Sequence, residues 1–331
     1  MNIANYLYSA VWFLPVRIFL SVLYGVIVSL RNWLYDHRLL KAVSVSVPVI
    51  SVGNISVGGS GKTILVQALI EYFVKHNKVP AVLSRGYGRS TKGLFLVADK
   101  TSLRGSVASS GDEPYLIATK HTGVPIVVAE DRVVGATYLI ETFRPDVIIL
   151  DDGFQHRRLH RGLDLVILDQ AKGPGNHHLP WGRLREPQSA LNRATLVLYS
   201  KAGLQDDLSQ NLILELDDYL TNYAGEHNPL PGLNGEYGLF AGLGNPTHFF
   251  TSMEALLGPS RTRIPLPDHV HYTRATLERI THEPCKLWIT TEKDFIKLDP
   301  AFCQQYNIHS IGVSTPLPPA LLGLLNQTFN L

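Results

Sequence analysis

SVGGSGKT, residues 56–63, is the stretch that decides the fold of this 331-residue chain. It follows a short apolar run that ends in glycine (residues 47–53) and opens a helical pattern from Lys62 to about Lys75. Glycines at such a turn let successive backbone N–H groups face an anion, and the start of a helix adds partial positive charge. The stretch is a variant of the phosphate-binding loop, because the strict motif has glycine where this chain has Ser56. We therefore predict a nucleotide-binding site formed by Ser56, Val57, Gly58, Gly59, Ser60, Gly61, Lys62 and Thr63.

Two side chains of this loop and an acidic pair elsewhere predict how phosphates and a magnesium ion are held. Lys62 is placed to reach the β- and γ-phosphates, and the Thr63 hydroxyl is placed to bind Mg²⁺. A second carboxylate for the metal is expected at the end of a neighbouring strand, where Asp151 and Asp152 follow four apolar residues. Acidic side chains at the end of a buried strand need a cationic partner. The sequence therefore predicts a nucleoside triphosphate with Mg²⁺, and it leaves open which of the two aspartates contacts the metal.

Short runs rich in valine, isoleucine and leucine alternate with helical patterns before residue 205. The runs stay apolar without alternating, which is typical of parallel strands buried on both faces. Strands are predicted at residues 47–53, 80–84, 94–98, 125–129, 147–150, 165–168 and 195–199. Helices are predicted at residues 62–75, 113–120 and 131–142. The predicted fold class is an α/β P-loop NTPase (RecA-like), with a mostly parallel sheet, helices on both faces, and ligands at the carboxyl ends of its strands.

A change in composition divides the chain. Residues 205–235 are polar and contain several prolines and glycines, which is typical of a linker. After it, strands are predicted at residues 237–242, 286–291 and 309–313, with a helix at 274–281. We expect an N-terminal helical segment at 1–44, the P-loop core at 45–204, the linker at 205–235, and a smaller α/β domain at 236–331.

The N-terminus is the most apolar part of the chain. Residues 18–30 carry no charge, and residues 6–14 are also mostly apolar, with Pro15 and Arg17 between them. The uncharged run has 13 residues, whereas a straight membrane span needs roughly 20. Three interpretations stay open: a membrane-associated helix in or dipping into the inner leaflet, a single span that tolerates Arg17, and a buried helix of a soluble core. A secretory signal is not favoured, since no lysine or arginine precedes Arg17.

Charge and cysteine content narrow the expected surroundings of the chain. The formal net charge of +2 is too small to indicate nucleic acid, and no nucleic-acid partner is expected. Cys285 and Cys303 fit neither a disulfide framework nor a zinc-ligand pattern, so we expect reduced thiols in a protein that faces the cytosol. Basic residues that would meet cytoplasmic headgroups follow the apolar run at Arg31, Arg38 and Lys41.

Acidic and basic residues in loops are candidates for the acceptor side of a phosphoryl transfer. Transfer to an alcohol needs a carboxylate that takes the proton of the hydroxyl, and Asp112 precedes a predicted helix. Asp112 could equally cap that helix, and the pair Asp268-His269 could be an ordinary surface turn. Arginines that could bind phosphate or face solvent lie in loops at residues 84–89, 154–158 and 182–187.

In combination, these motifs resemble the tetraacyldisaccharide 4′-kinase family of lipid A biosynthesis. The resemblance rests on VGNISVGGSGKT (52–63), SRGYGR (84–89), GDEP (111–114), EDR (130–132), ILDDGFQHR (149–157), GRLREP (182–187), PDH (267–269) and TTEKD (290–294). It covers nearly the whole chain, including the apolar N-terminus. The family usually has proline after the Lys-Thr pair, where this chain has Ile64, and that change touches only the first turn of the helix.

The resemblance implies a kinase at the cytoplasmic side of the inner membrane, associated through its N-terminal helix. It would use ATP and Mg²⁺ to phosphorylate the 4′-hydroxyl of a glycolipid, tetraacyldisaccharide 1-phosphate, making lipid IVA; we expect a monomer. Asp112 would activate the hydroxyl with the help of His269, while Lys62 binds the phosphates. The implied metal side comprises Thr63, Asp151, Asp152 and Glu113. The implied substrate-binding residues are Arg85, Tyr87, Arg132, Gln155, Arg183 and Arg185.

Two other classes of function remain as alternatives. A membrane-associated P-loop NTPase switch would hydrolyse nucleotide without phosphorylating a small molecule. Its GTPase form is disfavoured, because residues 291–294 (TEKD) have the wrong order for a guanine-binding motif. A non-enzymatic membrane scaffold would leave the phosphate-binding loop and the Asp pair unexplained. Dependence of ATP consumption on the lipid discriminates a kinase from a switch.

Overall fold

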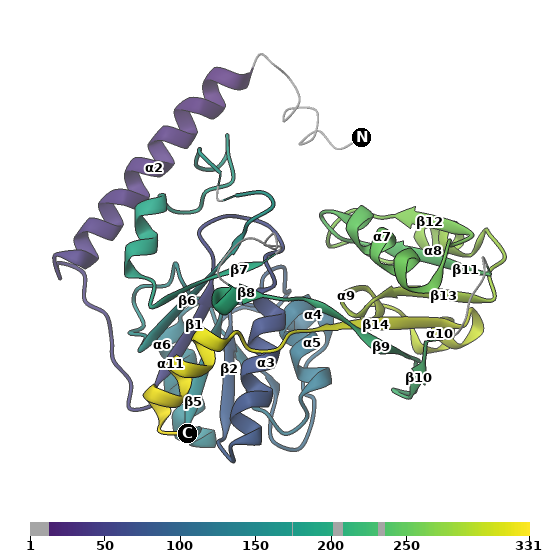
Figure 1. Ribbon diagram of the computed structural model, residues 1–331. Coiled ribbons are helices and arrows are strands. Elements are labelled where there is room, and N and C mark those ends of the chain that lie inside the picture. Colours follow the sequence, from purple (N-terminus) through teal and green to yellow (C-terminus); the bar gives the residue numbers. More distant parts are fainter. Residues whose placement is uncertain (1–12, 174, 201–207, 231–235) are drawn as a thin grey trace.

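The computed structural model describes residues 13–173, 175–200, 208–230 and 236–331. Within them, the larger sheet has the strand order β3-β4-β2-β5-β1-β6-β7-β8 (Figure 1). Its neighbouring strands pair in parallel, except that β3 is antiparallel to β4. The strands are β1 (Val49–Gly53), β2 (Pro80–Ser84), β3 (Phe95–Ala98), β4 (Ile126–Val128), β5 (Val147–Asp151), β6 (Leu163–Asp169), β7 (Leu196–Ser200) and β8 (Asn211–Leu212).

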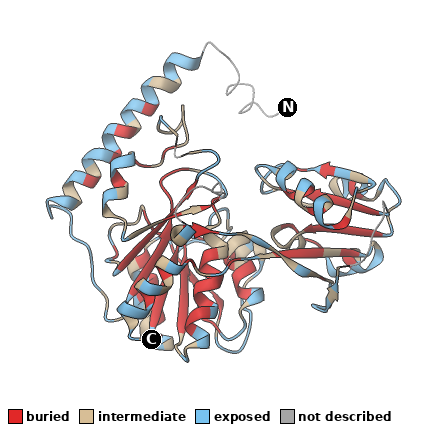
Figure 2. Ribbon diagram, in the orientation of Figure 1, coloured by how far each residue is buried: buried red, intermediate tan, exposed pale blue. Residues whose placement is uncertain are grey.

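Helices cover both faces of this sheet, and the strands between them are buried (Figure 2). One face is covered by α3 (Lys62–Lys75), α5 (Asp112–Lys120) and the C-terminal helix α11 (Pro319–Phe329), whose apolar side chains share one core with the sheet. The other face is covered by α6 (Arg132–Phe143) and, beside it, the 3₁₀ helix η2 (Gln188–Arg193). A short helix, α4 (Val107–Ser110), precedes α5. The predicted α/β fold with a mostly parallel, doubly covered sheet is confirmed.

The carboxyl ends of the parallel strands meet at one edge of the sheet. β1 lies between β5 and β6, and β5 also pairs with β2. The phosphate-binding loop follows β1, Asp151 ends β5, and Arg85 follows β2. Parallel pairing therefore gathers at one edge motifs that are up to a hundred residues apart in the sequence.

The second sheet has the order β10-β9-β14-β13-β11-β12. It consists of β9 (Glu215–Thr221), β10 (His227–Pro229), β11 (Tyr237–Ala241), β12 (Thr262–Pro265), β13 (Leu287–Thr291) and β14 (Ile308–Ser314). α7 (Pro246–Leu257) packs on one face, while α8 (Arg274–Thr281) and α10 (Pro300–Gln305) pack on the other. The one-turn helix α9 (Glu292–Phe295) follows β13 directly. This is the smaller α/β unit expected from the sequence.

The region expected to be a linker contains regular structure instead. Its described part holds η3 (Leu208–Gln210), β8, β9 and β10, while residues 205–207 and 231–235 lie outside the described ranges. β9 pairs antiparallel with β14, so both strands belong to the second sheet. Only one side chain of β9 is buried, which explains why its polar sequence does not resemble a core strand. After β14 the chain returns to the first unit, where α11 buries Leu321 and Leu325 in the larger core.

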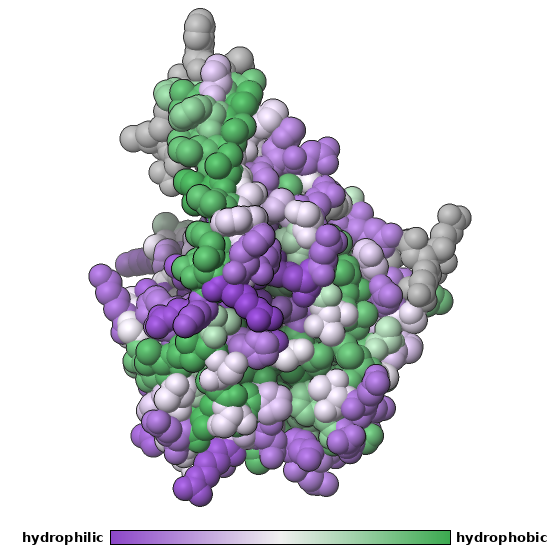
Figure 3. Space-filling model, turned by 90° about the vertical axis from the view of Figure 1, so that its left-hand side faces the viewer, coloured by the Kyte–Doolittle hydropathy of each residue, from purple (hydrophilic) through white to green (hydrophobic). Residues whose placement is uncertain are grey.

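The N-terminal helix, α2 (Leu14–Asp36), faces the body with its polar side. The helix is long and apolar enough to cross a membrane, yet of its 23 residues only Ser21, Gly25, Val28 and Asn32 are buried. This spacing defines one face of a helix. The large apolar side chains point outward, with Phe19 66% and Val26 58% exposed, and they form an apolar column along the helix (Figures 2 and 3). The interpretation as a buried helix of a soluble core is therefore wrong; of the upstream apolar segment, residues 6–12 lie outside the described ranges.

Candidate active site

The phosphate-binding loop has the backbone geometry that anion binding needs. Gly58 and Gly61 have φ values of 129° and 90°, which side chains other than glycine rarely adopt. Gly61 is the N-cap of α3, and no side chain caps the first turn of that helix. The backbone N–H groups at this turn are therefore not occupied by a side-chain cap and can bind phosphate. The buried Ser60 accepts a hydrogen bond from the side chain of Asn54 at 3.2 Å, which ties the part of the loop before α3 to the residue that follows β1.

The Asp pair lies against this loop. Lys62 Nζ is 3.6 Å from Asp152 Oδ1, and Arg185 Nη1 donates to Asp152 Oδ2 at 2.7 Å. Burial acts to raise the pKa of Asp152, but Lys62 and Arg185 outweigh it and lower that pKa. Asp152 also has a φ of 51°, in the left-handed region that aspartate adopts more readily than most residues other than glycine. Asp152 is thus held in place by two cations at the nucleotide edge.

Asp151 is in a different electrostatic state. It is 1% exposed, and Ser84 Oγ donates to its Oδ2 at 3.1 Å, while its Oδ1 has no hydrogen-bond partner among the described residues. Burial, together with the charges of Glu113 and Asp152, raises the pKa of Asp151 to about 7. A buried carboxylate oxygen without a partner, next to two further carboxylates, is a site that a divalent cation would neutralise. The predicted metal side therefore fits Mg²⁺.

The protein alone supplies few ligands at this position. Across the described ranges, no group of three or more His, Cys, Asp and Glu side chains could hold a metal. Mg²⁺ typically takes one or two carboxylates and completes its shell with water and phosphate oxygens. An ion here would thus depend on the nucleotide and the Thr63 hydroxyl in addition to Asp151 or Asp152.

Asp112 contacts the second unit rather than its own helix. It is the first residue of α5, whose N-cap is Gly111 with no side-chain cap. Asp112 Oδ2 accepts from His269 Nδ1 at 2.9 Å and is 2.8 Å from Lys297 Nζ. Burial acts to raise the pKa of Asp112, but Lys297 and His269 outweigh it and lower that pKa. The structure therefore brings together the two residues expected to activate the acceptor hydroxyl.

Lys297 is a residue that the sequence prediction missed. Its side chain is only 8% exposed and lies 3.9 Å from the fully buried Asp294, which accepts the Gly242 N–H at 2.8 Å. Lys297 follows the TTEKD motif by three residues, and only this position relative to the motif could have indicated it. Lys293, inside that motif, is 3.0 Å from Asp268 Oδ1 and 3.5 Å from His269 Nε2. The second unit thus surrounds the Asp112–His269 pair with two cations.

The predicted substrate-binding residues divide into two groups. Three have side chains that contact the nucleotide site: Gln155 donates to Asn54 O at 2.7 Å, Arg183 donates to Val57 O at 3.1 Å, and Arg185 pairs with Asp152. Of the other three, Arg85 and Tyr87 are exposed, whereas Arg132 is buried and close enough to Asp151 and Asp152 for their charges to act on it.

Arg132 and Tyr87 differ in what they contact. Burial and the neighbouring charge of Arg85 lower the pKa of Arg132 to about 10, and its Nε has no hydrogen-bond partner among the described residues. A buried guanidinium beside a second arginine is a strong candidate for anion binding. The Tyr87 ring is 6.1 Å from the His269 ring, so Tyr87 lies beside the acceptor pair.

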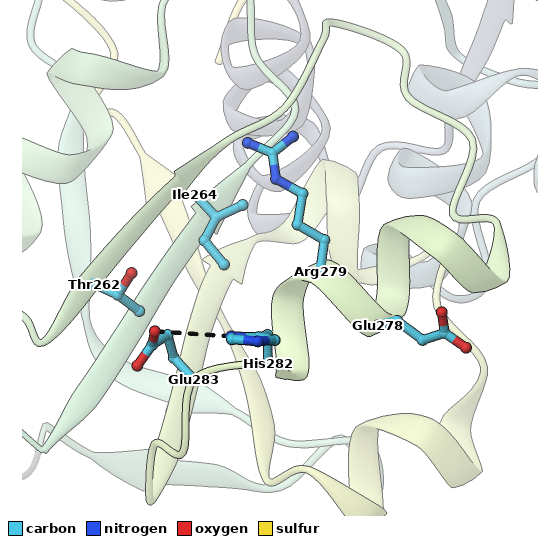
Figure 4. Close-up of a pocket in the computed structure, with 6 residues that line it drawn as sticks. All are labelled: Thr262, Ile264, Glu278, Arg279, His282 and Glu283. Carbon is cyan, nitrogen blue, oxygen red and sulfur yellow. Dashed lines mark ion pairs between the residues drawn. The ribbon is translucent and has the colours of Figure 1, made fainter.

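A surface hollow in the second unit is separate from these residues. Its volume is about 430 Å³, and it is lined by side chains of β12 and α8 and of the turn after α8 (Figure 4). His282 and Glu283 approach to 3.8 Å there. None of the lining residues belongs to the motifs described above, so the hollow is not the candidate site.

Comparison with known proteins agrees with the motifs. The sequence profile described as Tetraacyldisaccharide-1-P 4′-kinase matches residues 12–330. The tetraacyldisaccharide 4′-kinase of Aquifex aeolicus is 39% identical over 284 residues, 84% of this chain and 88% of the relative. That of Chlorobaculum parvum is 38% identical over 301 residues, 84% and 82% of the two chains.

A solved structure shows the same fold. It is the "apo" form of LpxK from Aquifex aeolicus in complex with ATP, with a TM-score of 0.79 and 34% sequence identity. The match covers 96% of this chain and 98% of that chain. The likeness therefore extends over both α/β units, and this chain belongs to the tetraacyldisaccharide 4′-kinase family.

Proposed function

We propose that this chain transfers the γ-phosphate of ATP to the 4′-hydroxyl of a tetraacyldisaccharide 1-phosphate, making lipid IVA in lipid A biosynthesis. The observation that carries the proposal is the position of Asp112. Its carboxylate is 2.9 Å from His269, and the next residue, Glu113, is near enough to Asp151 to raise the pKa of that aspartate. A base for an acceptor hydroxyl therefore lies beside the phosphate-binding edge.

The nucleotide would be held by the loop of residues 56–63. Its backbone N–H groups bind the phosphates, and Lys62 binds the terminal ones. Thr63 and the Asp pair hold the cation, with Glu113 adding negative charge nearby. When bound, Mg²⁺ supplies charge neutralisation at the phosphate oxygens. Asp151 Oδ1, which has no hydrogen-bond partner in the described part of the chain, supports this assignment.

Asp112 takes the proton of the acceptor hydroxyl in this proposal. Lys297 and the hydrogen bond from His269 keep its carboxylate ionised, which is the state that a base needs. His269 orients the carboxylate through Nδ1, which lies 2.9 Å from Asp112 Oδ2. His269 has a φ of 54°, so its backbone is also held in a strained conformation.

The arginines on the acceptor side would bind the 1-phosphate of the glycolipid. Arg132 is buried, its Nε has no hydrogen-bond partner among the described residues, and Arg85 lies close enough to lower the pKa of Arg132. A phosphate would neutralise both guanidinium groups and accept their N–H donors. Tyr87, exposed beside His269, would pack against the sugar. Gln155, Arg183 and Arg185 act from the nucleotide side, through the contacts described above.

The membrane association would use the outward face of α2. The helix is about 35 Å long, enough to cross a bilayer. Polar contacts to the body, however, run along its length, from Ser21 with His178 to Asp36 with Arg157. A helix bound to the body over this length lies along the surface with its apolar face in the leaflet. Arg38 and Lys41, which follow the helix, favour anionic headgroups of the cytoplasmic face of the inner membrane.

A monomer suffices for this proposal. Asp112 and His269 come from the two units of one chain, so the site needs no residue from a second copy. The alternative, an NTPase switch without a lipid acceptor, gives no role to the acceptor-side pair. Nucleic acid has no part in the proposal.

The test is phosphate transfer from γ-labelled ATP to a tetraacylated glucosamine disaccharide 1-phosphate in mixed micelles. The wild-type chain is expected to label the lipid at the 4′-position, and Lys62→Ala is expected to label none. ATP hydrolysis that proceeds equally without lipid, with no labelled lipid, would overturn the proposal in favour of the switch.

A further inference from the structure

One segment, residues 178–186, lies between α2 and the nucleotide site and is bonded to both. It is compact: Leu179 N–H donates to Leu184 O at 3.0 Å, and Gly182 N–H donates to His178 O at 2.7 Å. Only glycine fits at position 182, where a Cβ would come within 2.1 Å of His177 O. Leu184 is buried with Ile55 and Phe154 in a small core. The segment is therefore a well-fixed loop rather than a loose connection.

α2 contacts this segment through its buried face. Ser21 Oγ donates to His178 O at 2.7 Å, and the Tyr24 hydroxyl donates to Arg185 O at 3.0 Å. Asn32 Nδ2 donates to the fully buried Glu186 at 2.9 Å. Gly25 lets the two surfaces approach, because a Cβ there would lie 2.8 Å from His178 Nδ1. The helix thus fits the segment closely over three turns.

The other side of the segment contacts the phosphate-binding loop. Val57 N–H donates to Arg183 O at 2.9 Å, and the Arg183 guanidinium donates to Val57 O at 3.1 Å. Arg185 N–H donates to Ile55 O at 2.8 Å, and its guanidinium binds Asp152 at 2.7 Å. Asp152 in turn is the ion-pair partner of Lys62. One residue, Arg185, therefore joins α2, the residue that directly precedes the loop, and the Asp pair.

Glu186 fixes the next position along the chain. Arg193 binds both of its carboxylate oxygens, at 2.7 and 3.0 Å, and Asn32 supplies a further hydrogen bond. A buried carboxylate with these partners is fixed in position, because losing a donor leaves part of its hydrogen-bonding capacity unmet in the interior. Asn32 therefore contributes to where Glu186, and with it Arg185, is held.

We infer that α2 is part of the nucleotide site as well as a membrane contact, and that Tyr24 and Asn32 are positioning residues for Arg185, Asp152 and the phosphate-binding loop. A helix whose outer face touches lipid would then hold, with its inner face, the geometry that binds Mg²⁺-ATP. The inference rests on the nucleotide site of the proposed function, but it does not depend on which lipid accepts the phosphate.

The two faces of α2 allow a matched experiment on the full chain in detergent micelles. Binding of Mg²⁺-ATP is measured by calorimetry, and binding to vesicles of phosphatidylethanolamine and phosphatidylglycerol by sedimentation. Tyr24→Phe removes one hydrogen bond and is expected to weaken Mg²⁺-ATP binding by about fivefold. Gly25→Leu, which forces α2 away from the segment, and Tyr24→Phe combined with Asn32→Ala are expected to weaken it on the order of tenfold or more.

Two controls separate positioning from general damage. Val26→Ala, on the outer face, is expected to lower vesicle binding and to leave nucleotide affinity as in the wild type. Tyr223→Phe makes the same chemical change at an exposed tyrosine of the β9–β10 turn and is expected to leave nucleotide affinity unchanged. Thermal unfolding of each variant shows whether it is folded, and Tyr24→Phe is conservative enough to keep the test valid if Gly25→Leu fails to fold.

The inference is supported if nucleotide binding is weaker in the inner-face variants (Tyr24→Phe, Gly25→Leu and the double variant) and unchanged in the two controls. Wild-type nucleotide affinity in folded Tyr24→Phe and in the double variant would overturn it and leave α2 as an anchor only. A wild-type chain that binds Mg²⁺-ATP but labels no lipid would instead contradict the proposed function, and the inner-face comparison would still decide the inference.

Discussion

Lys297 lies between two carboxylates, Asp112 and Asp294, at distances of 2.8 and 3.9 Å. It is mostly buried, so its charge is needed to balance the two acids around it. No local sequence pattern indicates this role, because the lysine reaches Asp112 only when the second unit packs against the first. The sequence could predict Asp112 and His269 through the family motifs. The contact of Lys297 with Asp112 could not be predicted in this way, because it forms only where the two units pack together.

Replacing Lys297 by methionine is expected to affect both stability and catalysis. It leaves Asp112 and Asp294 without their cation, which costs about 3 kcal/mol in the free energy of unfolding. Because Asp112 loses a contact that orients it, kcat should fall while the KM for ATP changes little. Urea unfolding and steady-state kinetics check this, with Lys297→Arg as the variant that restores most of kcat. Equal kcat values for Lys297→Met and the wild type would contradict the role.

Asp151 gives the ligand-free chain a pH-dependent stability. Its folded pKa is raised to about 7, above the value of an unfolded aspartate, so the folded chain binds an extra proton between the two values. Stability from this group is therefore lost as pH rises from about 4 to about 7. Asp151→Asn, which carries no charge, should stabilise the chain more at about pH 8 than at about pH 5.

Thermal unfolding without nucleotide or Mg²⁺ at the two pH values measures this difference. Asp218→Asn, at an exposed position of β9, serves as the control and should show no such pH dependence. The same stability change for Asp151→Asn at both pH values would show that the aspartate is not held protonated in the folded chain.

At the scale of elements, the sequence predicted best the strands that are buried on both faces. Continuous apolar runs marked β1, β2 and β5, because helices cover both sides of these strands. β9 was not predicted, since its sequence is polar and only one of its side chains is buried. α11 was not predicted for another reason. It packs on the first unit, far from it in the sequence: the rings of Phe329 and Phe73 lie 5.0 Å apart, centroid to centroid.

The return of α11 to the first unit has a measurable consequence. Leu321 and Leu325 are fully buried in the larger core. Leu321→Ala should therefore lower the free energy of unfolding by about 2–4 kcal/mol. Gln327→Ala, at an exposed position of the same helix, should change it by less than about 0.5 kcal/mol. Urea denaturation compares the two, and a similar small effect for both would mean that α11 does not belong to that core.

At the scale of the whole molecule, the account rests on two features: the contact between the two units at α5, and the apolar outer face of α2. The second unit contacts both ends of α5, through His269 and Lys297 at Asp112, and through Glu292, which is 2.9 Å from Lys120. On another side of the first unit, α2 presents its apolar column to solvent (Figure 3). An exposed apolar column of this kind would not help an enzyme that acts on a soluble sugar. An enzyme whose substrate stays in a leaflet must instead work at the membrane surface.

Charges placed in this column should weaken membrane binding without unfolding the chain. Phe19→Glu combined with Val26→Glu removes two exposed apolar side chains from the leaflet and should lower binding to anionic vesicles by more than about tenfold. Sedimentation with vesicles measures the effect. Gln327→Glu, on α11, tests whether an added surface charge alone is enough, and it should bind vesicles like the wild type.

The most direct test of a site shared between the two units is a double-mutant cycle on Asp112 and His269. Phosphate transfer to the tetraacylated disaccharide is measured for Asp112→Asn, His269→Ala and the double variant. We predict that Asp112→Asn lowers kcat by about 10²–10⁴, and that adding His269→Ala lowers it little further, because the two residues act as one pair. Losses that simply multiply, or wild-type kcat in His269→Ala, would contradict a pair that acts across the two units.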